Sequence, residues 1–149
     1  MRQQEQETSL MLHTEYGKGA LEAIQYLTDL GLAPERILIC HADRQVKDLD
    51  IHEKIASTGV FMEYDTITLF EFHDNETEIR MLKHMVGRGF LDQILISTDP
   101  TADRLKSYGG RYGMDYILKT FIPRLKECGF TEEEIRRITR ENPGRALGR

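Results

Sequence analysis

Histidine and carboxylate side chains stand at the ends of several apolar segments of this sequence. The segment LMLH ends in His13, ILICH ends in His41, and ILISTD ends in Asp99. Imidazole nitrogens and carboxylate oxygens are protein ligands of Zn²⁺ and similar divalent ions, and three of them leave a coordination position for water. Such an ion lowers the pKa of its water to about 7, which makes that water a nucleophile. These residue types therefore predict a metal or catalytic site, provided that the three segments meet in space.

A purely structural interpretation stays open beside the metal site. A histidine at the end of a strand commonly forms a structural hydrogen bond, and the sequence contains no compact metal motif such as HExxH. Glu63 and Asp65 lie at the end of another apolar segment, VFMEYD. We expect them either to line the same pocket or to accept hydrogen bonds from ligand imidazoles.

Strand and helix patterns alternate along the chain. Short apolar runs predict four strands, at 9–13, 37–41, 60–65 and 93–97. Apolar residues at helical spacing predict helices within 17–32, 48–59 and 75–88, and a helical hairpin over 114–129 and 131–147. Four strand–helix units in succession predict an α/β fold with a parallel sheet. All strands of such a sheet end at the same edge, so this fold brings His13, His41 and Asp99 to one rim.

Local signals refine the predicted helical hairpin. Thr131 and Glu134 have the spacing of a capping box, which predicts the start of the second helix. Pro123 should kink the first helix or mark its first turn.

The composition limits the class of protein. The 149 residues suffice for one domain, and a net charge of -5 without a basic stripe argues against nucleic acid as a partner. No apolar stretch reaches the roughly 18 residues of a membrane span, and the polar start MRQQEQETSL lacks the apolar core of a signal peptide. The two cysteines have no CxxC spacing. We therefore expect a cytoplasmic protein with no membrane contact, a single domain over 1–149 and a polar N-terminal tail at 1–8.

Five segments of the chain resemble the carboxyl-terminal half of the phosphotriesterase family, within the metal-dependent amidohydrolase superfamily. They are LMLHTE, ILICHAD, GVFMEYDTI, QILISTD and the stretch from YGGRYG to NPGRAL. The resemblance implies half of a (β/α)₈ TIM barrel, with strands equivalent to strands 5 to 8. It implies that His13, His41 and Asp99 are metal ligands, that the centre is binuclear with Zn²⁺ as the expected ion, and that Asp99 is also the catalytic base.

The resemblance also implies a function. It predicts a metal-dependent hydrolase acting on a small-molecule ester, with a lactone or phosphorylated lactone preferred over an organophosphate. Some members of the family hold a substrate phosphate with basic residues in the loop after the last strand, and Arg104 lies in the matching loop. Arg104 is therefore the predicted substrate-binding residue. A solvated charged loop is the alternative interpretation of this segment.

The chain also departs from the family pattern. The family carries an HxH pair and a bridging lysine in its other half, and this sequence contains no HxH. A half-barrel has unpaired sheet edges, which predicts a homo-oligomer or a partner half-barrel. A second hypothesis is therefore a catalytically inactive half-barrel that associates with itself or with a partner chain. A third is an open flavodoxin-like binding domain, against which the lack of a phosphate-binding glycine loop argues.

The remaining polar candidates have plainer interpretations. His73, in FEFHDNE, is interpreted as a surface loop histidine, with contact to substrate as the alternative. His52 and His84 lie in helical segments among charged residues and are expected at the surface. Arg44 follows Asp43 directly and is expected to pair with Asp43 or Asp65.

Overall fold

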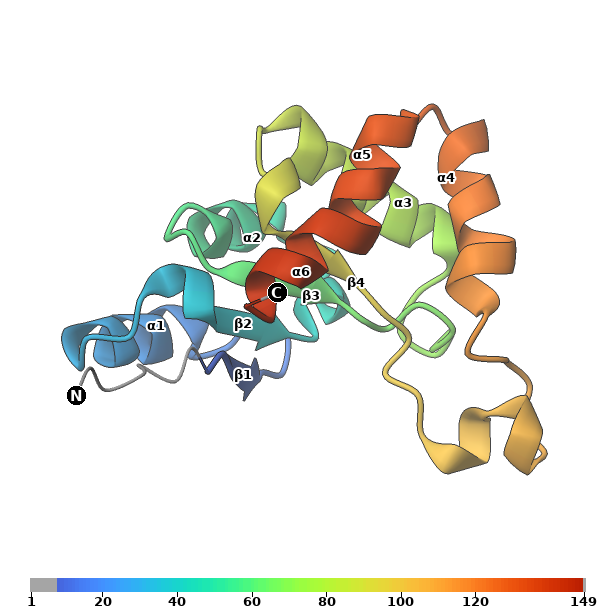
Figure 1. The fold of residues 1–149 in the computed structure, drawn as a ribbon, viewed down its shortest axis with the longest axis horizontal. Coiled ribbons are helices and arrows are strands. Elements are labelled where there is room, and N and C mark those ends of the chain that lie inside the picture. The colour runs from blue at the N-terminus through green and yellow to red at the C-terminus, as the bar shows by residue number, and fades with distance from the viewer. Residues whose placement is uncertain (1–7, 149) are drawn as a thin grey trace, which may run out of the picture.

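The chain folds around one parallel β-sheet. A computed structural model describes residues 8–148 of the chain. The strands of the sheet are β1 (Leu10–His13), β2 (Ile37–Cys40), β3 (Phe61–Tyr64) and β4 (Ile94–Ile96). The strands lie in the order β1-β2-β3-β4, so each pairs with the next strand along the chain (Figure 1). Parallel neighbours joined by crossover helices confirm the predicted α/β fold.

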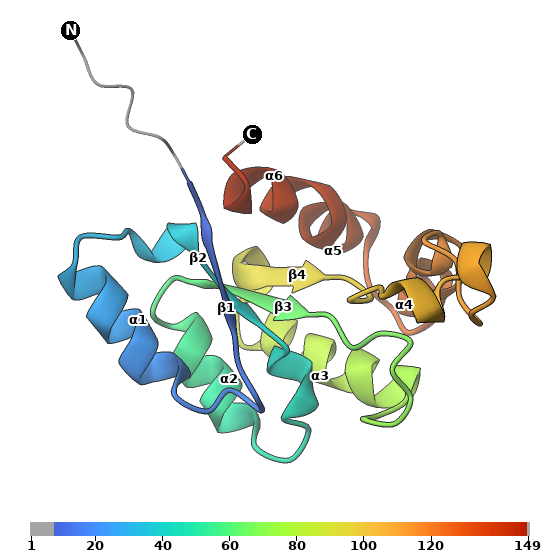
Figure 2. The ribbon, with the colours of Figure 1, turned by 90° about the horizontal axis from the view of Figure 1, so that it is seen from below.

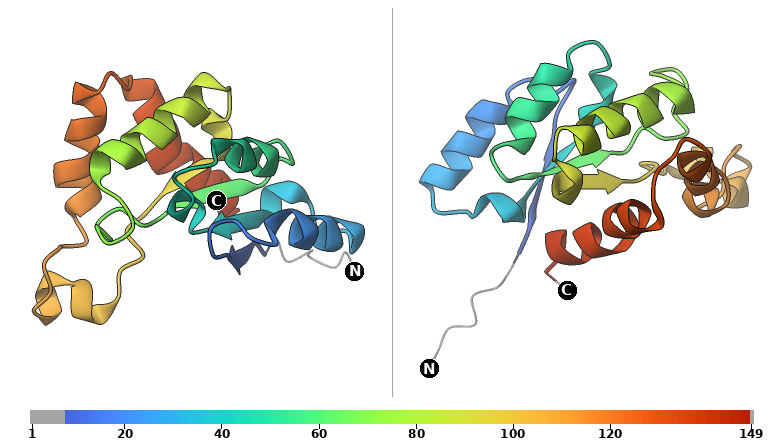
Figure 3. Two further views of the ribbon diagram at one scale, coloured as in Figure 1. Left: turned by 180° about the vertical axis from the view of Figure 1, so that it is seen from behind. Right: turned by 90° about the horizontal axis from the view of Figure 1, so that it is seen from above.

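Helices cover both faces of the sheet (Figures 2 and 3). The crossover helices α1 (Ala20–Asp29), α2 (Leu49–Ala56) and α3 (Asn75–Gly87) pack on one face. The chain continues through α4 (Ile122–Glu127), α5 (Glu132–Arg136) and α6 (Asn142–Ala146). Ala146 of α6 is buried with Leu38, Phe61 and Leu95, so the end of α6 covers part of the opposite face.

The alternation of side chains along the strands explains how one sheet serves both packing and chemistry. Ile37 and Ile39 of β2 point into the main core under the crossover helices, where both are fully buried. Their neighbour Cys40 lies on the other face, where it is paired in register with His13 of β1. The carboxyl ends of the strands therefore present polar groups on the face opposite the main core.

The predicted hairpin signals are confirmed. The Thr131 hydroxyl accepts the backbone N–H of Glu134 at 3.1 Å, and the Glu134 carboxylate accepts the backbone N–H of Thr131 at 2.7 Å. Pro123 lies in the first turn of α4, directly after a π-helical turn over Ile117–Phe121. The predicted tail at 1–8 lies outside the described residues except for Thr8. Within the described chain, none of the helices has the length and hydropathy of a membrane span.

The surface prediction for His52 is wrong. His52 is 1% exposed on the inner side of α2, between the backbone carbonyl of Gln45, 2.7 Å from Nε2, and the Tyr64 hydroxyl, 2.9 Å from Nδ1. A carbonyl oxygen only accepts, so Nε2–H of the neutral ring donates to Gln45 and the Tyr64 hydroxyl donates to Nδ1. Burial lowers the pKa of His52, which keeps the ring neutral. His84 is half-buried beside Glu53.

Asn142 provides a test of how the C-terminal helix is attached to the sheet. Its side-chain amide is buried and donates to the carbonyl oxygens of Leu91 and Ile94, both at 2.8 Å. Asn142→Asp replaces these donors with a buried carboxylate, so we expect the free energy of unfolding to fall by about 3 kcal/mol in urea titrations. Asn75→Asp is the matched control: the Tyr116 hydroxyl, which accepts from the Asn75 amide at 2.9 Å, can instead donate to a carboxylate, and a carboxylate is favourable at the first residue of α3, so stability should change much less.

Candidate metal centre

The backbone is in an uncommon conformation at two of the three predicted ligands. His41 follows β2 directly with φ 60°, and Asp99 has φ 39°. Residues other than glycine rarely adopt this left-handed region, and they do so mostly where the surrounding contacts compensate, often at functional sites. Because His41 adopts this conformation directly after β2, its side chain no longer follows the alternation of side chains between the two faces of the sheet.

Asp65 fixes the orientation of His41. Its carboxylate accepts the backbone N–H of His41 at 3.0 Å and lies 2.7 Å from Nδ1 of the ring. With Asp65 ionised, Nδ1 carries the hydrogen, so the neutral imidazole has its lone pair on Nε2. Burial and the charge of Arg44 lower the pKa of His41, which favours the neutral ring that a metal ligand requires.

His13 presents a matching nitrogen from β1. Nδ1 of His13 lies 3.0 Å from Nε2 of His41, while Nε2 of His13 lies 3.0 Å from the carboxylate of Glu15. Because Glu15 accepts the hydrogen on Nε2, the facing Nδ1 is also a lone-pair nitrogen. Two lone pairs that face each other repel unless a proton or a metal cation lies between them. The outer carboxylates therefore prepare this imidazole pair to hold a cation.

In the metal-free chain a proton lies between Nε2 of His41 and Nδ1 of His13. Burial, together with the negative charges of Asp43 and Glu63, raises the pKa of Asp65 to about 8. A protonated Asp65 donates to Nδ1 of His41, and Nε2–H of His41 then donates to Nδ1 of His13. A divalent cation would replace this proton and stabilise the ionised Asp65. The same geometry thus fits the metal that the sequence predicts.

A cavity of about 350 Å³ joins the three predicted ligands. His13, His41 and Asp99 all line it, together with Cys40, Glu63 and Asp65. The ligand atoms of Cys40, Glu63 and Asp65 lie within 4.8 Å of one another and form a possible metal-binding group. Burial and the carboxylate of Glu63 raise the pKa of the Cys40 thiol, so the thiol stays protonated and is a poor nucleophile in the metal-free protein.

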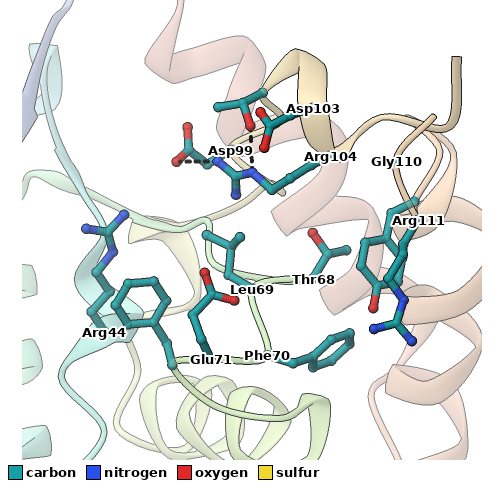
Figure 4. Close-up of a pocket in the computed structure, with 13 residues that line it drawn as sticks. Arg44, Thr68, Leu69, Phe70, Glu71, Asp99, Asp103, Arg104, Gly110 and Arg111 are labelled. Atoms are coloured by element: carbon teal, nitrogen blue, oxygen red, sulfur yellow. Dashed lines mark hydrogen bonds and ion pairs between the residues drawn. The ribbon is translucent and has the colours of Figure 1, made fainter. Parts of the chain in front are cut away.

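A second cavity of about 620 Å³ adjoins the first at Asp99 and carries three arginines, Arg44, Arg104 and Arg111 (Figure 4). The Arg104 guanidinium donates to the Thr101 hydroxyl at 2.7 Å and lies 3.7 Å from the Asp99 carboxylate. Nη1 of Arg104 and Nε of Arg44 are buried without a hydrogen-bond partner among residues 8–148. Unfilled donors in a cavity suit an anionic ligand.

The loop that carries Arg104 is tightly folded. A Cβ at Gly110 would lie 2.1 Å from the backbone carbonyl carbon of Arg104, so only glycine fits at this position. The backbone N–H of Gly110 donates to the carbonyl oxygen of Leu105 at 2.8 Å. The backbone of this loop therefore fixes the shape of the side of the second cavity that Arg104 and Gly110 line.

The structure corrects two predictions about polar residues. Arg44 pairs with Glu15 at 2.8 Å and lies over the ring of Phe72, rather than pairing with Asp43 or Asp65. His73 is neither a surface histidine nor a lining residue of the two cavities, because its side chain is only 4% exposed and lies 3.1 Å from Glu78. Glu15 was missed, although it stands two residues after His13.

Comparisons with known proteins decide the family. A profile described as the phosphotriesterase family matches residues 2–147. This chain belongs to the phosphotriesterase family. It is 36% identical over 133 residues to the phosphotriesterase homology protein of Escherichia coli, a match that covers 88% of this chain and 44% of that protein. The crystal structure of the Escherichia coli protein with phosphate in its active site superposes with a TM-score of 0.85, covering 93% of this chain and 48% of that one.

Two further relatives have named activities. An N-acetyltaurine hydrolase of Dictyostelium discoideum is 34% identical over 158 residues, covering 97% of this chain and 42% of that protein. A phospho-furanose lactonase of Mycoplasmopsis synoviae is 29% identical over 146 residues, covering 93% of this chain and 41% of that protein. The chain therefore spans less than half the length of these relatives, and its four parallel strands are half of a TIM barrel.

The raised pKa of Asp65 predicts how the stability of the metal-free chain depends on pH. Between about pH 4 and pH 8 the folded chain keeps a proton on Asp65 that the unfolded chain releases. The contribution of Asp65 to the free energy of unfolding should therefore fall as pH rises through this window. Asp65→Asn removes the titrating group, so its urea-measured stability should fall less over the same window. Equal pH slopes for the variant and the parent would contradict this assignment.

Proposed function

We propose that this chain carries the metal-ligating and substrate-binding residues of a metal-dependent hydrolase that acts on an ester. The observation that carries the proposal is the pair of facing nitrogens of His13 and His41, 3.0 Å apart, whose outer nitrogens are held by carboxylates. Asp99 lines the same cavity. Two imidazoles and a carboxylate are a ligand set for Zn²⁺.

When bound, the ion would supply Lewis-acid polarisation of the substrate and a water of lowered pKa. The residues of this chain supply the rest. Once ionised, Asp65 would hold His41 in the tautomer that leaves Nε2 free, and Glu15 would do the same for Nδ1 of His13. The Asp99 carboxylate accepts a proton from the attacking water as general base, a role typically worth about 10²–10⁴ in rate.

A phosphorylated lactone fits the second cavity better than an organophosphate triester. Arg44, Arg104 and Arg111 line it, and Asp99 belongs to both cavities, so a substrate with its ester at Asp99 places a remote group among the arginines. A phosphate is an anion that guanidinium groups bind through two donors. A neutral triester has no such anion to offer. Arg104 is the proposed phosphate ligand because it is nearest to Asp99.

A second candidate function is association of the half-barrel with another copy or with a partner half. The observation that favours it is the edge strand β1, where Leu10 and Met11 are 38% and 54% exposed. An exposed apolar edge is a template for pairing with another strand. A partner half could also contribute further ligands to the centre.

His41→Asn tests the metal site directly. We expect the variant to lose Zn²⁺ from the strand-end cavity, because the amide cannot replace the imidazole nitrogen that faces His13. Native mass spectrometry measures bound zinc and the number of chains per particle together. His84→Asn is the control, since His84 contacts Glu53 outside both cavities and should leave zinc content unchanged. Equal zinc content in His41→Asn and the parent chain would refute the site.

Arg104→Gln tests the substrate class. Losing a charged hydrogen bond should lower kcat/KM for a phosphorylated lactone by roughly 10- to 100-fold, mainly through KM, and leave an unphosphorylated lactone nearly unaffected. Arg88→Gln is the control, because Arg88 is an exposed arginine that pairs with Glu53. An equal loss on both substrates would instead assign Arg104 to the positioning of Asp99.

A further inference from the structure

A second group of ionisable side chains lies outside both cavities. Asp43 comes from the turn after β2, His73 from the loop between β3 and α3, and Glu78 from α3. Asp43 and Glu78 are both 0% exposed, and the His73 side chain is 4% exposed. Their ligand atoms lie within 4.8 Å of one another. Residues from three separate elements thus converge in a site with almost no contact with solvent.

The hydrogen bonds around His73 leave the acceptor nitrogen Nε2 without a hydrogen-bond donor. Nδ1 lies 3.1 Å from the backbone carbonyl oxygen of Asp74, which only accepts, so Nδ1 carries the hydrogen of the neutral ring. Nε2 then faces the Thr66 hydroxyl at 2.9 Å and a carboxylate oxygen of Glu78 at 3.1 Å. The Thr66 hydroxyl donates its single hydrogen to Asp43 at 2.7 Å. The lone pair of Nε2 therefore faces two oxygen atoms that need a positive charge between them.

The carboxylates are incompletely satisfied as well. Oδ2 of Asp43 accepts the backbone N–H and the hydroxyl of Thr66, but its Oδ1 is buried without a hydrogen-bond partner in the described chain. Oε1 of Glu78 likewise accepts no hydrogen bond from a donor among residues 8–148, and the Asp43 and Glu78 carboxyl groups can pair with each other only by sharing a proton. A buried carboxylate oxygen without a partner costs several kcal/mol of solvation, which a bound cation offsets.

We propose that Asp43, His73 and Glu78 form a second divalent-cation site, closed to solvent and suited to Zn²⁺. One imidazole and two carboxylates are a ligand set that this borderline ion accepts. Ligands about 2.0–2.2 Å from one ion lie roughly 3–4 Å from each other. Nε2 of His73 lies 3.1 Å from Oε2 of Glu78 and 3.9 Å from Oδ2 of Asp43, which agrees with this spacing, and each carboxylate has a second oxygen without a donor. Two carboxylates with a neutral imidazole also balance the charge of a divalent ion.

The position of this site gives it a structural role. The ion would tie the turn after β2 and the loop between β3 and α3 to the body of α3. That loop carries Thr68, Phe70 and Phe72, which line the arginine-bearing cavity. Thr68 has φ 93°, so the loop holds a strained backbone position that benefits from an anchor. The second site therefore stabilises one wall of the proposed substrate cavity.

The test compares zinc content in four chains: the parent, Glu78→Gln, His41→Asn and the double variant. After dialysis against Zn²⁺ and removal of free metal, Glu78→Gln should hold one ion fewer than the parent, and the double variant one fewer than His41→Asn. Added Zn²⁺ should raise the Tm of His41→Asn but not that of the double variant. Glu76→Gln is the matched control, because Glu76 lies on the same helix with a side chain that is 60% exposed.

The outcomes separate this proposal from the hydrolase site. Loss of one ion in Glu78→Gln together with unchanged zinc in His41→Asn would support the second site and refute the first. Equal zinc content in the parent and in a folded Glu78→Gln chain would overturn the second site and assign a shared proton to the cluster. Far-ultraviolet circular dichroism checks folding, and His73→Asn, which removes the nitrogen ligand, must lose the same ion.

Discussion

The candidate centre depends on the hydrogen bond between Asp65 and Nδ1 of His41. This contact is 2.7 Å long, and with Asp65 ionised it puts the hydrogen on Nδ1 and leaves the Nε2 lone pair facing His13. It also gathers a buried carboxylate close to Asp43 and Glu63, which raises the pKa of Asp65. Ionising the buried Asp65 carboxyl group is unfavourable in the metal-free chain, and the charge of a divalent ion would offset this unfavourable free energy. Local destabilisation and metal affinity thus have one cause.

The parallel sheet explains why this centre could be predicted from strand ends. Each of β1 to β4 was predicted from a short apolar run, and all of them end at one edge, where His13, His41 and Asp99 share a cavity. The φ values of His41 and Asp99 had no signal in the sequence, because they depend on contacts made across the sheet. Asp65 was predicted either to line the pocket or to accept a hydrogen bond from a ligand imidazole; it lines the cavity, and its carboxyl group lies 2.7 Å from Nδ1 of His41.

The errors concern histidines whose burial depends on tertiary packing. His52 lies three residues after Leu49 and three before Ile55, so it shares the inner side of α2, and helical spacing alone could have predicted its burial. His73 had no comparable signal, since it lies in a loop without periodicity and is buried only because α3 brings Glu78 against it. The pairing of Arg44 with Glu15 likewise joins residues 29 positions apart. Such contacts follow from the fold and not from local sequence.

The exposure of the two imidazoles shows where the centre is open. The His41 side chain is 9% exposed, whereas the His13 side chain on the edge strand β1 is 64% exposed. A charge interaction is several times weaker in water than in a dry site, so a cation held at His13 would be screened on that side. Another strand against β1 would remove this water and strengthen every contact to the ion. Strand pairing at β1 and metal affinity are therefore coupled, and an increase in one should accompany an increase in the other.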